Sequence, residues 1–442
     1  MTGLLTDLYQ LTMAAGYFEA GKTAESATFE LFFRRLPRYR NYVVAAGLQQ
    51  AVDYLLNLKF TDEEIDYLRG LRQFQRVSDG FFDALRQLRF TGDVFAMREG
   101  TPIFANEPFL TVRAPLMEAQ IAETYLLATI GFQSLIATKA SRIVEVAGGR
   151  AVVDFGARRA HSAEAGVLAG RAAYIGGCIG TSNTETGFRY GIPVFGTAAH
   201  SWVQSFATET EAFERLQNLL GDATAYLIDT YDTLEGARSA AALGQPLWGV
   251  RLDSGNLVEL SRQVRRILDD AGLRDAKIMA TSDLNEYRIL EYTAAGAPLD
   301  AFGVGTDLAT SADAPALGAV YKMVELEENG VKRYTAKLSE GKHTMPGMKQ
   351  VFRLADRDVI TCAGECGAGQ PLIRPVISRG LLLEPLPDVH AARRNAHESL
   401  NRLPVACRSL FESEDKYPVE YSAELRRLAD GVLAGLSQEV AG

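Results

Sequence analysis

The most informative segment of the chain reads Gln245-Pro-Leu-Trp-Gly-Val-Arg-Leu-Asp-Ser-Gly-Asn256. Residues 247–252 are apolar apart from Arg251 and lie between Pro246 and Ser254-Gly255, which predicts a short buried strand. A helical pattern follows, so the strand delivers Arg251 and Asp253 to the turn before a helix. A Ser-Gly turn allows close approach of the backbone to a ligand, and a helix N-terminus favours anions. Taken alone, the two charges indicate either a buried ion pair or part of an anion site.

The same pattern recurs from residue 151 onward. A short apolar run is followed each time by a polar, glycine-rich turn and then by a helical pattern, and the runs cover residues 151–155, 173–178, 192–195, 225–228, 247–252, 277–280 and 301–304. Alternating strands and helices predict a parallel sheet. About seven such units in about 155 residues suit an irregular parallel α/β barrel, in which the site lies at the C-terminal ends of the strands.

The residues that follow these runs are small, hydroxylated or charged. They read Asp154-Phe-Gly-Ala-Arg-Arg159, Gly180-Thr-Ser-Asn-Thr184, Gly196-Thr-Ala-Ala-His-Ser201, Asp229-Thr-Tyr-Asp-Thr233, Arg251-Leu-Asp-Ser-Gly-Asn256, Thr281-Ser-Asp-Leu-Asn285 and Gly303-Val-Gly-Thr-Asp307. Helix capping accounts for part of the Ser, Thr and Asp content. Capping does not account for three arginines and a histidine on one rim, so the pattern predicts a phosphate-binding catalytic face.

The flanking regions mix helical and strand patterns. We expect residues 1–147 to form an N-terminal α+β domain and residues 148–312 to form the barrel with its catalytic face. Residues 313–442 are expected to form a C-terminal region whose strands join the N-terminal domain before a helical tail. Within it, Asn329-Gly330 lies between two strand patterns and predicts a hairpin. The fold is therefore expected to combine an α/β barrel with an α+β domain built from both chain ends.

Two segments near the N-terminus are candidates for ligand contact. A helix is predicted over residues 6–19, with Thr6 as its cap and Leu8 on its buried side, whereas Tyr9 falls off that side. Residues 34–41 contain four arginines among turn-forming residues. This basic segment is either a solvated loop or a clamp for a polyanion.

Composition limits the class of protein. The 442 residues are 47% hydrophobic and 23% charged, which is typical of a globular chain, and no run reaches the roughly 18 apolar residues of a membrane span. The N-terminus lacks the pattern of a signal peptide, so a cytoplasmic location is expected. The formal charge of −9 disfavours a nucleic-acid binder and requires a local cationic pocket for any anionic ligand.

The four cysteines do not suggest a disulfide framework, because they are few and scattered. Cys362 and Cys366 have the spacing of half a metal-binding knuckle. No second Cys or His pair lies at ligand spacing from them, so whether they bind a metal stays open.

With these residues in view, the chain resembles the nicotinate phosphoribosyltransferase family over roughly residues 4–380. The resemblance rests on seven segments that occur in the family's order, namely Leu5-Thr-Asp-Leu-Tyr-Gln10, Phe33-Arg-Arg-Leu-Pro37, Asp154-Phe-Gly-Ala-Arg-Arg159, Gly180-Thr-Ser-Asn-Thr184, Gly196-Thr-Ala-Ala-His-Ser201, Val250-Arg-Leu-Asp-Ser-Gly255 and Phe302-Gly-Val-Gly-Thr306. Each segment is a weak signal alone, and the ordered set is specific. The tail beyond about residue 385 matches less well.

The resemblance implies an enzyme of NAD salvage in the ATP-dependent ligase class. It implies synthesis of nicotinate mononucleotide and pyrophosphate from nicotinate and phosphoribosyl pyrophosphate, coupled to ATP hydrolysis. Mg2+ is implied as a cofactor that is held through the pyrophosphate rather than by the protein alone. A homodimer with sites shared between subunits is implied as well, with no nucleic-acid or membrane partner.

The resemblance also implies roles for individual residues. Phe155 and Tyr9 of the partner subunit sandwich the pyridine ring, and His200 is the position that ATP phosphorylates. The implied catalytic residues are His200, Arg251, Asp253 and Asp283, and the implied substrate-binding residues are Asp7, Tyr9, Arg34, Lys139, Phe155, Arg158, Thr181, Ser182, Ser254, Gly305 and Thr306.

The residues at the strand ends suit this chemistry independently. Breaking the anomeric C–O bond develops positive charge on the ribose and negative charge on the pyrophosphate. Carboxylates near the ribose and arginine with Mg2+ near the leaving group meet these charges. The pyridine nitrogen is itself the nucleophile, so no general base is required.

Other functions are weighed against specific residues. A nicotinamide-specific relative carries Asp where this chain has Ser182, and an Asp there would repel nicotinate. A quinolinate-type enzyme would be shorter, and an aldolase would need a Schiff-base lysine at one of the strand ends, which carry none. A silent nucleotide sensor is disfavoured by intact His200, Arg251 and Asp253. A turnover assay separates sensor from enzyme.

Overall fold

The computed structural model describes residues 2–336, 344–411 and 416–441. The chain forms two compact units, which we call unit 1 (Met1–Leu135 with Ala316–Gly442) and unit 2 (Ile136–Pro315). The first division falls inside helix α6 (Glu123–Val146), whereas the sequence pattern places a boundary at 147/148. A continuous helix carries no sequence signal at the residue where its packing partners change.

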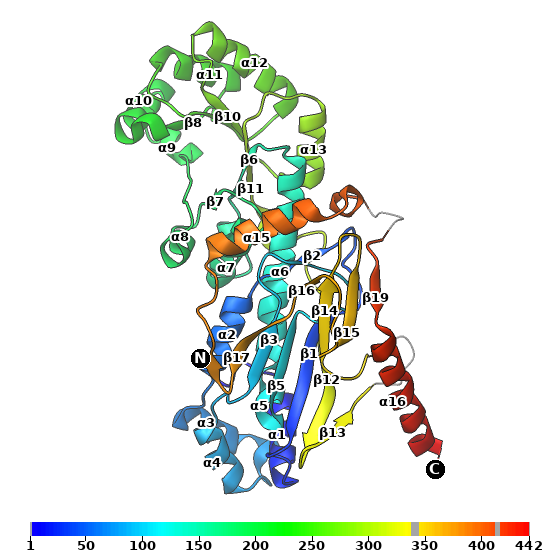
Figure 1. The fold of residues 1–442 in the computed structure, drawn as a ribbon. Helices are drawn as coiled ribbons and strands as arrows, with labels where there is room; N and C mark the ends of the chain where they lie inside the picture. The colour runs from blue at the N-terminus through cyan, green and yellow to red at the C-terminus, as the bar shows by residue number, and fades with distance from the viewer. Residues whose placement is uncertain (1, 337–343, 412–415, 442) are drawn as a thin grey trace. The chain divides into compact units, whose positions relative to one another are not determined.

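Unit 1 is built on a seven-stranded antiparallel sheet in the order β13-β12-β1-β5-β3-β17-β18 (Figure 1). Its strands are β1 (Ser26–Phe33), β3 (Asp93–Ala96), β5 (Leu110–Pro115), β12 (Ala319–Glu328), β13 (Val331–Tyr334), β17 (Arg374–Ser378) and β18 (Leu381–Leu382). Strand β1 pairs with β12, and β3 pairs with β17, so both ends of the chain contribute to one sheet. The predicted hairpin is present, with Asn329 and Gly330 at positive φ between β12 and β13.

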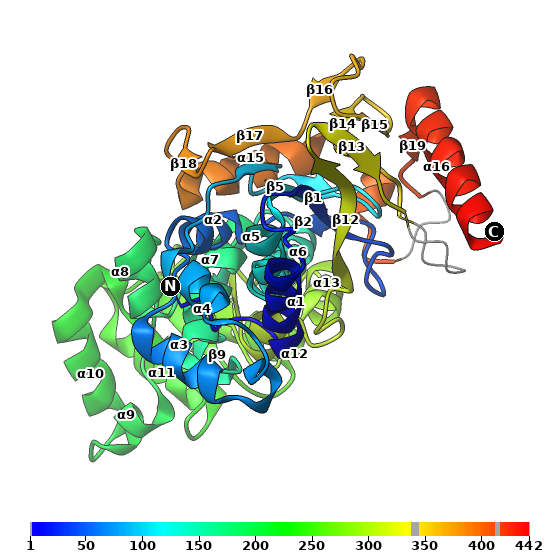
Figure 2. The ribbon, with the colours of Figure 1, turned by 90° about the horizontal axis from the view of Figure 1, so that it is seen from below.

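Helices and two small sheets complete unit 1. The helices are α1 (Leu8–Glu19), α2 (Leu48–Leu56), α3 (Asp62–Gly70), α4 (Asp79–Gln87), α5 (Leu116–Ile121), α15 (Val389–Arg402) and α16 (Ala423–Ala441). Strands β14 (Lys349–Arg353), β15 (Asp358–Cys362), β16 (Gln370–Pro371) and β19 (Val419–Tyr421) form one small sheet, and β2 (Val43–Val44) pairs with β4 (Pro102–Ile103). The tail helix α16 lies beside β19 (Figure 2).

The start of α1 differs from the sequence prediction. Asp7, not Thr6, occupies the N-cap position, because the Thr6 hydroxyl donates instead to the carbonyl oxygen of Ile121 at 3.0 Å. Leu8 is exposed rather than buried. The helix buries Leu11, Ala14 and Ala15, so its packed side begins one turn later than the apolar pattern predicts.

Unit 2 contains a six-stranded parallel sheet in the order β7-β6-β11-β10-β9-β8. Its strands are β6 (Ala151–Asp154), β7 (Gly180–Thr181), β8 (Ala225–Leu227), β9 (Gly249–Leu252), β10 (Lys277–Ala280) and β11 (Ala301–Val304). The first strand β6 pairs with the last strand β11, which is the closure of a barrel. Val194 adds one isolated bridge to Thr181, and the described residues show no pairing from there to β8, so the predicted irregular barrel is confirmed with one open side.

Two of the seven predicted strands are wrong, because residues 192–195 form only the isolated bridge at Val194 and residues 173–178 form no strand. Residues 173–178 continue the buried helix α7 (Ala163–Ile175) into a turn, and the strand is the short β7 that follows. Nearly all of the second half of α7 is buried, so its sequence shows a continuous apolar run rather than a helical period.

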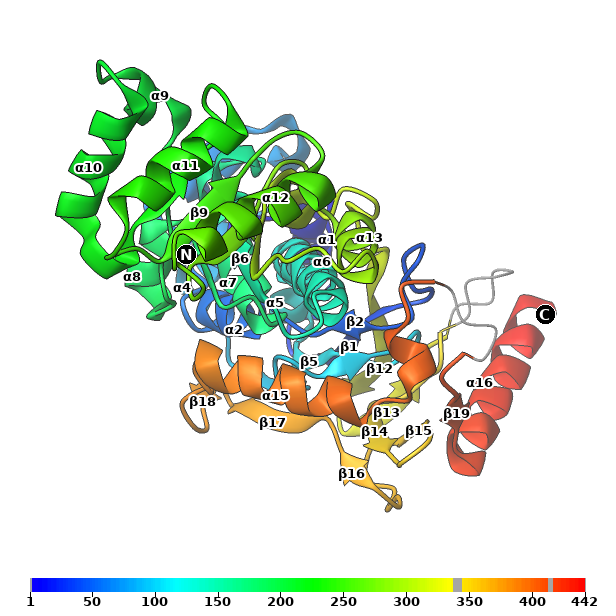
Figure 3. The same cartoon turned by 90° about the horizontal axis from the view of Figure 1, so that it is seen from above.

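The remaining helices of unit 2 follow the strands, and α10, α11 and α12 lie side by side in Figure 3. They are α8 (Thr184–Tyr190), α9 (His200–Gln204), α10 (Glu209–Leu220), α11 (Thr233–Leu243), α12 (Leu257–Asp270), α13 (Glu286–Ala294) and α14 (Thr306–Thr310). Side chains of Asn183, Asp232, Asn256 and Asn285 accept hydrogen bonds from the first turns. Capping therefore does explain part of the polar strand ends, as expected. In the described part of the chain, every helix falls short of the length and apolarity of a membrane span.

Candidate functional site

A cavity of about 600 Å³ opens at the C-terminal ends of β6, β7, β9, β10 and β11. It is lined by residues that the sequence places at strand ends. The predicted site residues among them are Phe155, Arg158, Ser182, Arg251, Asp253, Asp283, Gly305 and Thr306, and the others include Arg159, Thr197, Thr281 and Gly303. Five strand ends and the segment at residues 195–199 thus converge on one cavity of unit 2.

Arg251 is the most constrained side chain of this cavity. Its Nε donates to Thr281 Oγ1 at 2.9 Å, Nη1 to Thr197 Oγ1 at 2.9 Å, and Nη2 to Asp253 Oδ1 at 3.0 Å. Thr281 Oγ1 also donates to Asp253. Three partners from three loops fix the plane of the guanidinium, which therefore presents its charge to the cavity without further reorganisation.

Phe155 provides an aromatic wall beside this charge. The guanidinium carbon of Arg251 lies 5.7 Å from the centre of the Phe155 ring, within the range of a cation–π contact. The ring packs over Gly303, where a Cβ would come within 2.6 Å of Phe155 Cδ2 and 2.7 Å of Thr281 Cγ2. Only glycine at 303 leaves room for the ring in this position.

Two carboxylates that follow β8 and β9 lie near His200, namely Asp253, which lines the cavity, and Asp229, which, like His200, lies outside its lining. Asp229 Oδ2 accepts from the Asp253 amide at 3.0 Å and from the Ser254 hydroxyl at 2.6 Å. His200, the first residue of α9, has Nδ1 3.1 Å from Thr230 Oγ1 and Nε2 3.8 Å from Asp253 Oδ2. The predicted catalytic residues His200 and Asp253 are therefore neighbours, and Ser254 acts on Asp253 through Asp229.

Thr181 lies beneath the cavity rather than in its wall. Its hydroxyl donates to Asp154 Oδ2 at 2.7 Å and accepts from the Asn183 amide at 3.1 Å. Burial raises the pKa of Asp154, although hydrogen bonds from Thr181 and the Gly156 amide lower it. This network sets the backbone on which Ser182 faces the cavity.

The turn that carries Asp283 is strained. Ser282 and Asp283 have φ values of 86° and 45°, a conformation that costs non-glycine residues roughly 1 kcal/mol or more each. Strain at consecutive residues is retained where surrounding structure and function require it. It directs Asp283 to the cavity beside Thr281.

Lys139 does not line the cavity. Its fully buried ammonium lies 2.6 Å from Glu286 Oε2, 2.9 Å from Asp313 Oδ1 and 3.2 Å from Asp307 Oδ1. Burial alone would lower the pKa of Lys139, but the carboxylates of Glu286 and Asp313 outweigh it and raise the pKa. Asp307 directly follows Thr306 of the cavity wall, so Lys139 is linked to the site through that loop.

Three predicted site residues lie in unit 1. Asp7 accepts from the Thr124 hydroxyl at 2.9 Å, and Arg34 lies over the ring of Phe32. Tyr9 is exposed, and burial of its hydroxyl together with the carboxylate of Glu123 raises its pKa to about 12. All three residues belong to unit 1, and none of them is among the residues that line the cavity of unit 2.

The residues of the site that were not predicted as such include four with a hydroxyl or carboxylate group, namely Thr197, Asp229, Thr230 and Thr281. All occur in the strand-end segments quoted above. Their signal was a hydroxyl or carboxylate at a strand end, which is also the signal for a helix cap. Among the described residues, no group of three or more His, Cys, Asp or Glu has the geometry of a metal site, and Cys362 and Cys366 are unpaired thiols.

Comparison with known proteins identifies relatives over most of the chain. A model of the nicotinate phosphoribosyltransferase N-terminal domain matches residues 4–131, and a model of the nicotinate phosphoribosyltransferase family matches residues 150–337. Nicotinate phosphoribosyltransferase pncB2 of Mycobacterium tuberculosis is 45% identical over 441 residues, covering 96% of this chain and 93% of the relative. The Bacillus subtilis nicotinate phosphoribosyltransferase is 46% identical over 363 residues, covering 80% and 73%. The crystal structure of human nicotinic acid phosphoribosyltransferase superposes with a TM-score of 0.85 at 29% identity, covering 97% and 99%.

Proposed function

Because the chain belongs to the nicotinate phosphoribosyltransferase family, we propose that it joins nicotinate to the ribose of phosphoribosyl pyrophosphate, releasing pyrophosphate and nicotinate mononucleotide. The observation that carries the proposal is the fixed guanidinium of Arg251 against the ring of Phe155. A flat aromatic acid needs an aromatic face and a nearby cation, and the cavity provides both. We place the reaction in NAD salvage, in the cytoplasm.

The choice of acid over amide rests on the charges of the cavity. Arg158, Arg159 and Arg251 face it, and the neutral Ser182 lies at the position where a carboxylate would repel nicotinate. Arg251 or Arg158 would pair with the nicotinate carboxylate, and the other cations with phosphate groups. A nicotinamide substrate would leave one of these cations without its partner.

In the proposed reaction the pyridine nitrogen attacks the anomeric carbon as the C–O bond to pyrophosphate breaks. The electron pair of that bond leaves with the pyrophosphate, and no proton is transferred at the reacting atoms. Asp253 and Asp283 would face the ribose as it gains positive charge, because both line the cavity. Asp253 is held for this purpose by Arg251 and Thr281.

The carboxylates also fit a Mg2+ ion that is shared with the substrate. Asp229 Oδ1 is buried and, among the described residues, has no hydrogen-bond partner, and Asp253 adjoins it. Mg2+ is typically held by one or two carboxylates, water and phosphate oxygens. Such an ion neutralises charge on a leaving pyrophosphate.

We further propose that ATP phosphorylates His200. In the tautomer in which Nδ1 carries the proton and donates to Thr230 Oγ1, Nε2 keeps its lone pair, and Nε2 lies 3.8 Å from Asp253 Oδ2. Attack of Nε2 on the γ-phosphorus would form an N–P bond as the P–O bond to ADP breaks, and water would later release phosphate. A charged group gained next to Asp253 is well placed to alter substrate binding in one state of the cycle only.

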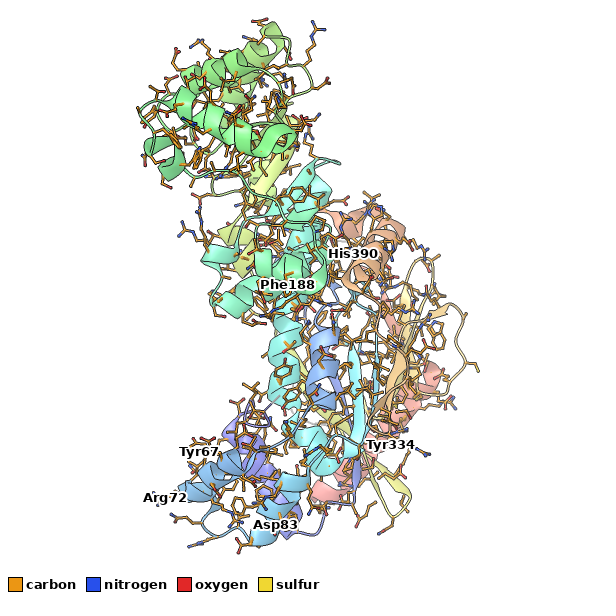
Figure 4. All side chains as sticks on the ribbon, turned by 90° about the vertical axis from the view of Figure 1, so that its left-hand side faces the viewer. Tyr67, Arg72, Asp83, Phe188, Tyr334 and His390 are labelled. Carbon is orange, nitrogen blue, oxygen red and sulfur yellow. The ribbon has the colours of Figure 1, made fainter. Side chains whose placement is uncertain are left out.

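The proposed working form is a homodimer. Leu5, Leu8, Tyr9 and Met13 form an exposed apolar set at the start of α1, and Phe188 on α8 is 87% exposed and points outward in Figure 4. Exposed apolar sets of this kind mark interfaces. Tyr9 of the partner subunit would then close over the ring held by Phe155, with Asp7 and Arg34 contributed from the same side.

The test is turnover with nicotinate, phosphoribosyl pyrophosphate and Mg2+, with and without ATP, monitored by formation of the mononucleotide. His200→Ala should retain basal turnover but lose nicotinate-stimulated ATP hydrolysis and the ATP-driven drop in substrate KM. His397→Ala removes an exposed histidine of α15 and serves as the control. ATP coupling that persists in folded His200→Ala would refute the phosphohistidine, and absence of mononucleotide under all conditions would refute the activity.

A further inference from the structure

A second cavity, of about 440 Å³, lies entirely within unit 1 and has no role in the proposed reaction. Four arginines line it, namely Arg98, Arg353, Arg374 and Arg402. The described residues that line this cavity include neither Asp nor Glu. In a chain with a formal charge of −9, this concentration of positive charge is local. We call this cavity the arginine pocket.

Among the described residues, one of the four arginines forms an ion pair. Arg353 Nη2 lies 2.5 Å from Asp358 Oδ2 and donates to the Pro102 carbonyl at 2.8 Å, so Arg353 is a structural part of the wall. No ion pair to Arg98, Arg374 or Arg402 occurs among the residues that the structure describes. These three guanidinium groups are exposed to the pocket and to solvent.

Two of the acidic groups near the pocket, Glu99 and Asp358, are already engaged elsewhere, whereas Glu398, one turn before Arg402 on α15, is exposed to solvent. Glu99, next to Arg98, accepts from the Gly47 amide at 2.6 Å. Asp358 is fully buried against Arg353 and the Tyr417 hydroxyl. Glu99 and Asp358 are therefore not available to neutralise the three remaining cations, and among the described residues Glu384, which lines an adjoining cavity with Arg98 and Arg374, forms no ion pair with them.

The backbone holds the three arginines together despite their mutual repulsion. Arg374 begins β17 opposite Ala96 of β3, and Arg98 follows β3 by two residues. Arg402 ends α15, which is anchored where Asn395 donates to the Glu99 carbonyl at 2.8 Å. The favourable interaction of Arg402 with the helix dipole explains its position at the end of α15 but not the convergence of all three.

We propose that the arginine pocket binds a diphosphate that carries an organic group. Guanidinium forks match phosphoryl oxygens in bidentate geometry, and three unmatched cations suit the roughly −3 charge of a diphosphate. The volume exceeds what a diphosphate alone fills and lies within the range of small-molecule sites. Leu354, Pro371, Leu372 and Leu403 line the remainder and suit an uncharged substituent.

Binding is measured by calorimetric titration of the full chain with ADP, with inorganic pyrophosphate and with citrate, at about 150 mM salt. The titrations use the Arg251→Ala background, which weakens anion binding in the cavity of unit 2. We expect one site per chain for ADP, a weaker one for pyrophosphate, and none for citrate. Adding Arg374→Gln and Arg402→Gln should weaken ADP binding at least about tenfold, because each removes a charge-assisted contact.

The matched control replaces Arg72 and Arg76 with glutamine. Both are exposed, Arg72 lies at the outer edge of unit 1 in Figure 4, and the control removes the same total charge. It should leave ADP binding unchanged. The proposal is overturned if the pocket double variant binds ADP like its parent, if the control weakens binding equally, or if citrate binds as well as ADP.

Arg98→Gln provides a second variant if the double variant does not fold, and should itself weaken ADP binding. Thermal unfolding of each variant checks that the fold is intact. The readout is binding and not turnover. Failure of the arginine pocket is therefore distinguishable from failure of the proposed transferase activity.

Discussion

Replacing Lys139 with methionine is expected to destabilise unit 2 without removing any group from the cavity wall. The substitution keeps an unbranched side chain, one heavy atom shorter, and deletes its charge. The ammonium is fully buried and lies within 2.6 to 3.2 Å of carboxylates of Glu286, Asp313 and Asp307. Methionine would leave these carboxylates facing one another.

The expected loss of stability depends on the partners and the solvent exposure that each carboxylate keeps after the substitution. Glu286 is fully buried but keeps Arg142, whose Nε donates to it at 3.1 Å. Asp307 and Asp313 are 29% and 21% exposed, so water partly solvates them. Breaking a fully buried pair costs about 3–5 kcal/mol. Partial exposure reduces this to roughly 2–3 kcal/mol, which lowers the unfolding midpoint of a unit of this size by roughly 4–12 °C.

The assay is calorimetric unfolding, with hydrogen exchange to assign the loss to α6, α13 and α14. The control is Lys277→Met, which deletes an exposed ammonium 3.7 Å from Asp300 in the same unit and should cost no more than about 1 kcal/mol. Because the folded pKa of Lys139 is raised above 10.5, its contribution is complete at neutral pH and is lost as the pH rises through that pKa. The difference between wild type and variant should also narrow in acid, where the carboxylates of the variant become protonated.

The refuting result is specific. A Lys139→Met protein that unfolds like wild type but binds phosphoribosyl pyrophosphate poorly would show that Lys139 contacts the substrate directly, as the family resemblance implies. The ion cluster would then be secondary. Loss of stability with a nearly unchanged substrate KM, measured well below the midpoint, supports a role in positioning the Thr306–Asp307 loop.

Three further predictions address the cavity and the dimer. Gly303→Ala should displace the Phe155 ring, cost about 1–3 kcal/mol in thermal unfolding and raise KM for nicotinate, and an unchanged KM would contradict the packing. Ser182→Asp should reduce kcat/KM for nicotinate about tenfold or more relative to nicotinamide, and equal losses would exclude contact with the carboxylate. Mixing inactive Tyr9→Ala and Arg251→Ala dimers should restore up to roughly a quarter of wild-type activity, since half the dimers would carry one intact site, and inactive verified heterodimers would refute a shared site.

The strand ends were predictable because parallel strands bring their C-terminal ends to one edge. Phe155, Arg251 and Asp283 therefore meet in one cavity although about 130 residues separate the first from the last. Their pairings were not predictable. That Arg251 would use the hydroxyl of Thr197 and that of Thr281 depends on loop geometry, and hydroxyl groups at strand ends serve equally well as helix caps.

Other features depend on contacts that leave no local pattern. The partners of Lys139 lie about 150 to 170 residues away, so the sequence alone does not distinguish a buried ion cluster from a ligand contact. The apolar run at 173–178 has the composition of a strand because α7 is buried on nearly every side. Thr6 is not the N-cap of α1, because its hydroxyl donates to the carbonyl oxygen of Ile121, which is distant in the sequence.

The pairing of β1 with β12 determines how long β1 lacks one of its two neighbouring strands while the chain is synthesised. Seven of the eight residues of β1 are buried, yet β12 follows the other neighbour, β5, by about 200 residues. At roughly 5–20 residues per second, a ribosome needs about 10–40 s to make that interval. For this time unit 2 can fold while β1, already able to pair with β5, keeps its other edge unpaired, and other chains can pair with that edge. Slower translation or loss of chaperones during this interval should therefore reduce the yield of folded protein even when the stability of the finished sheet is unchanged.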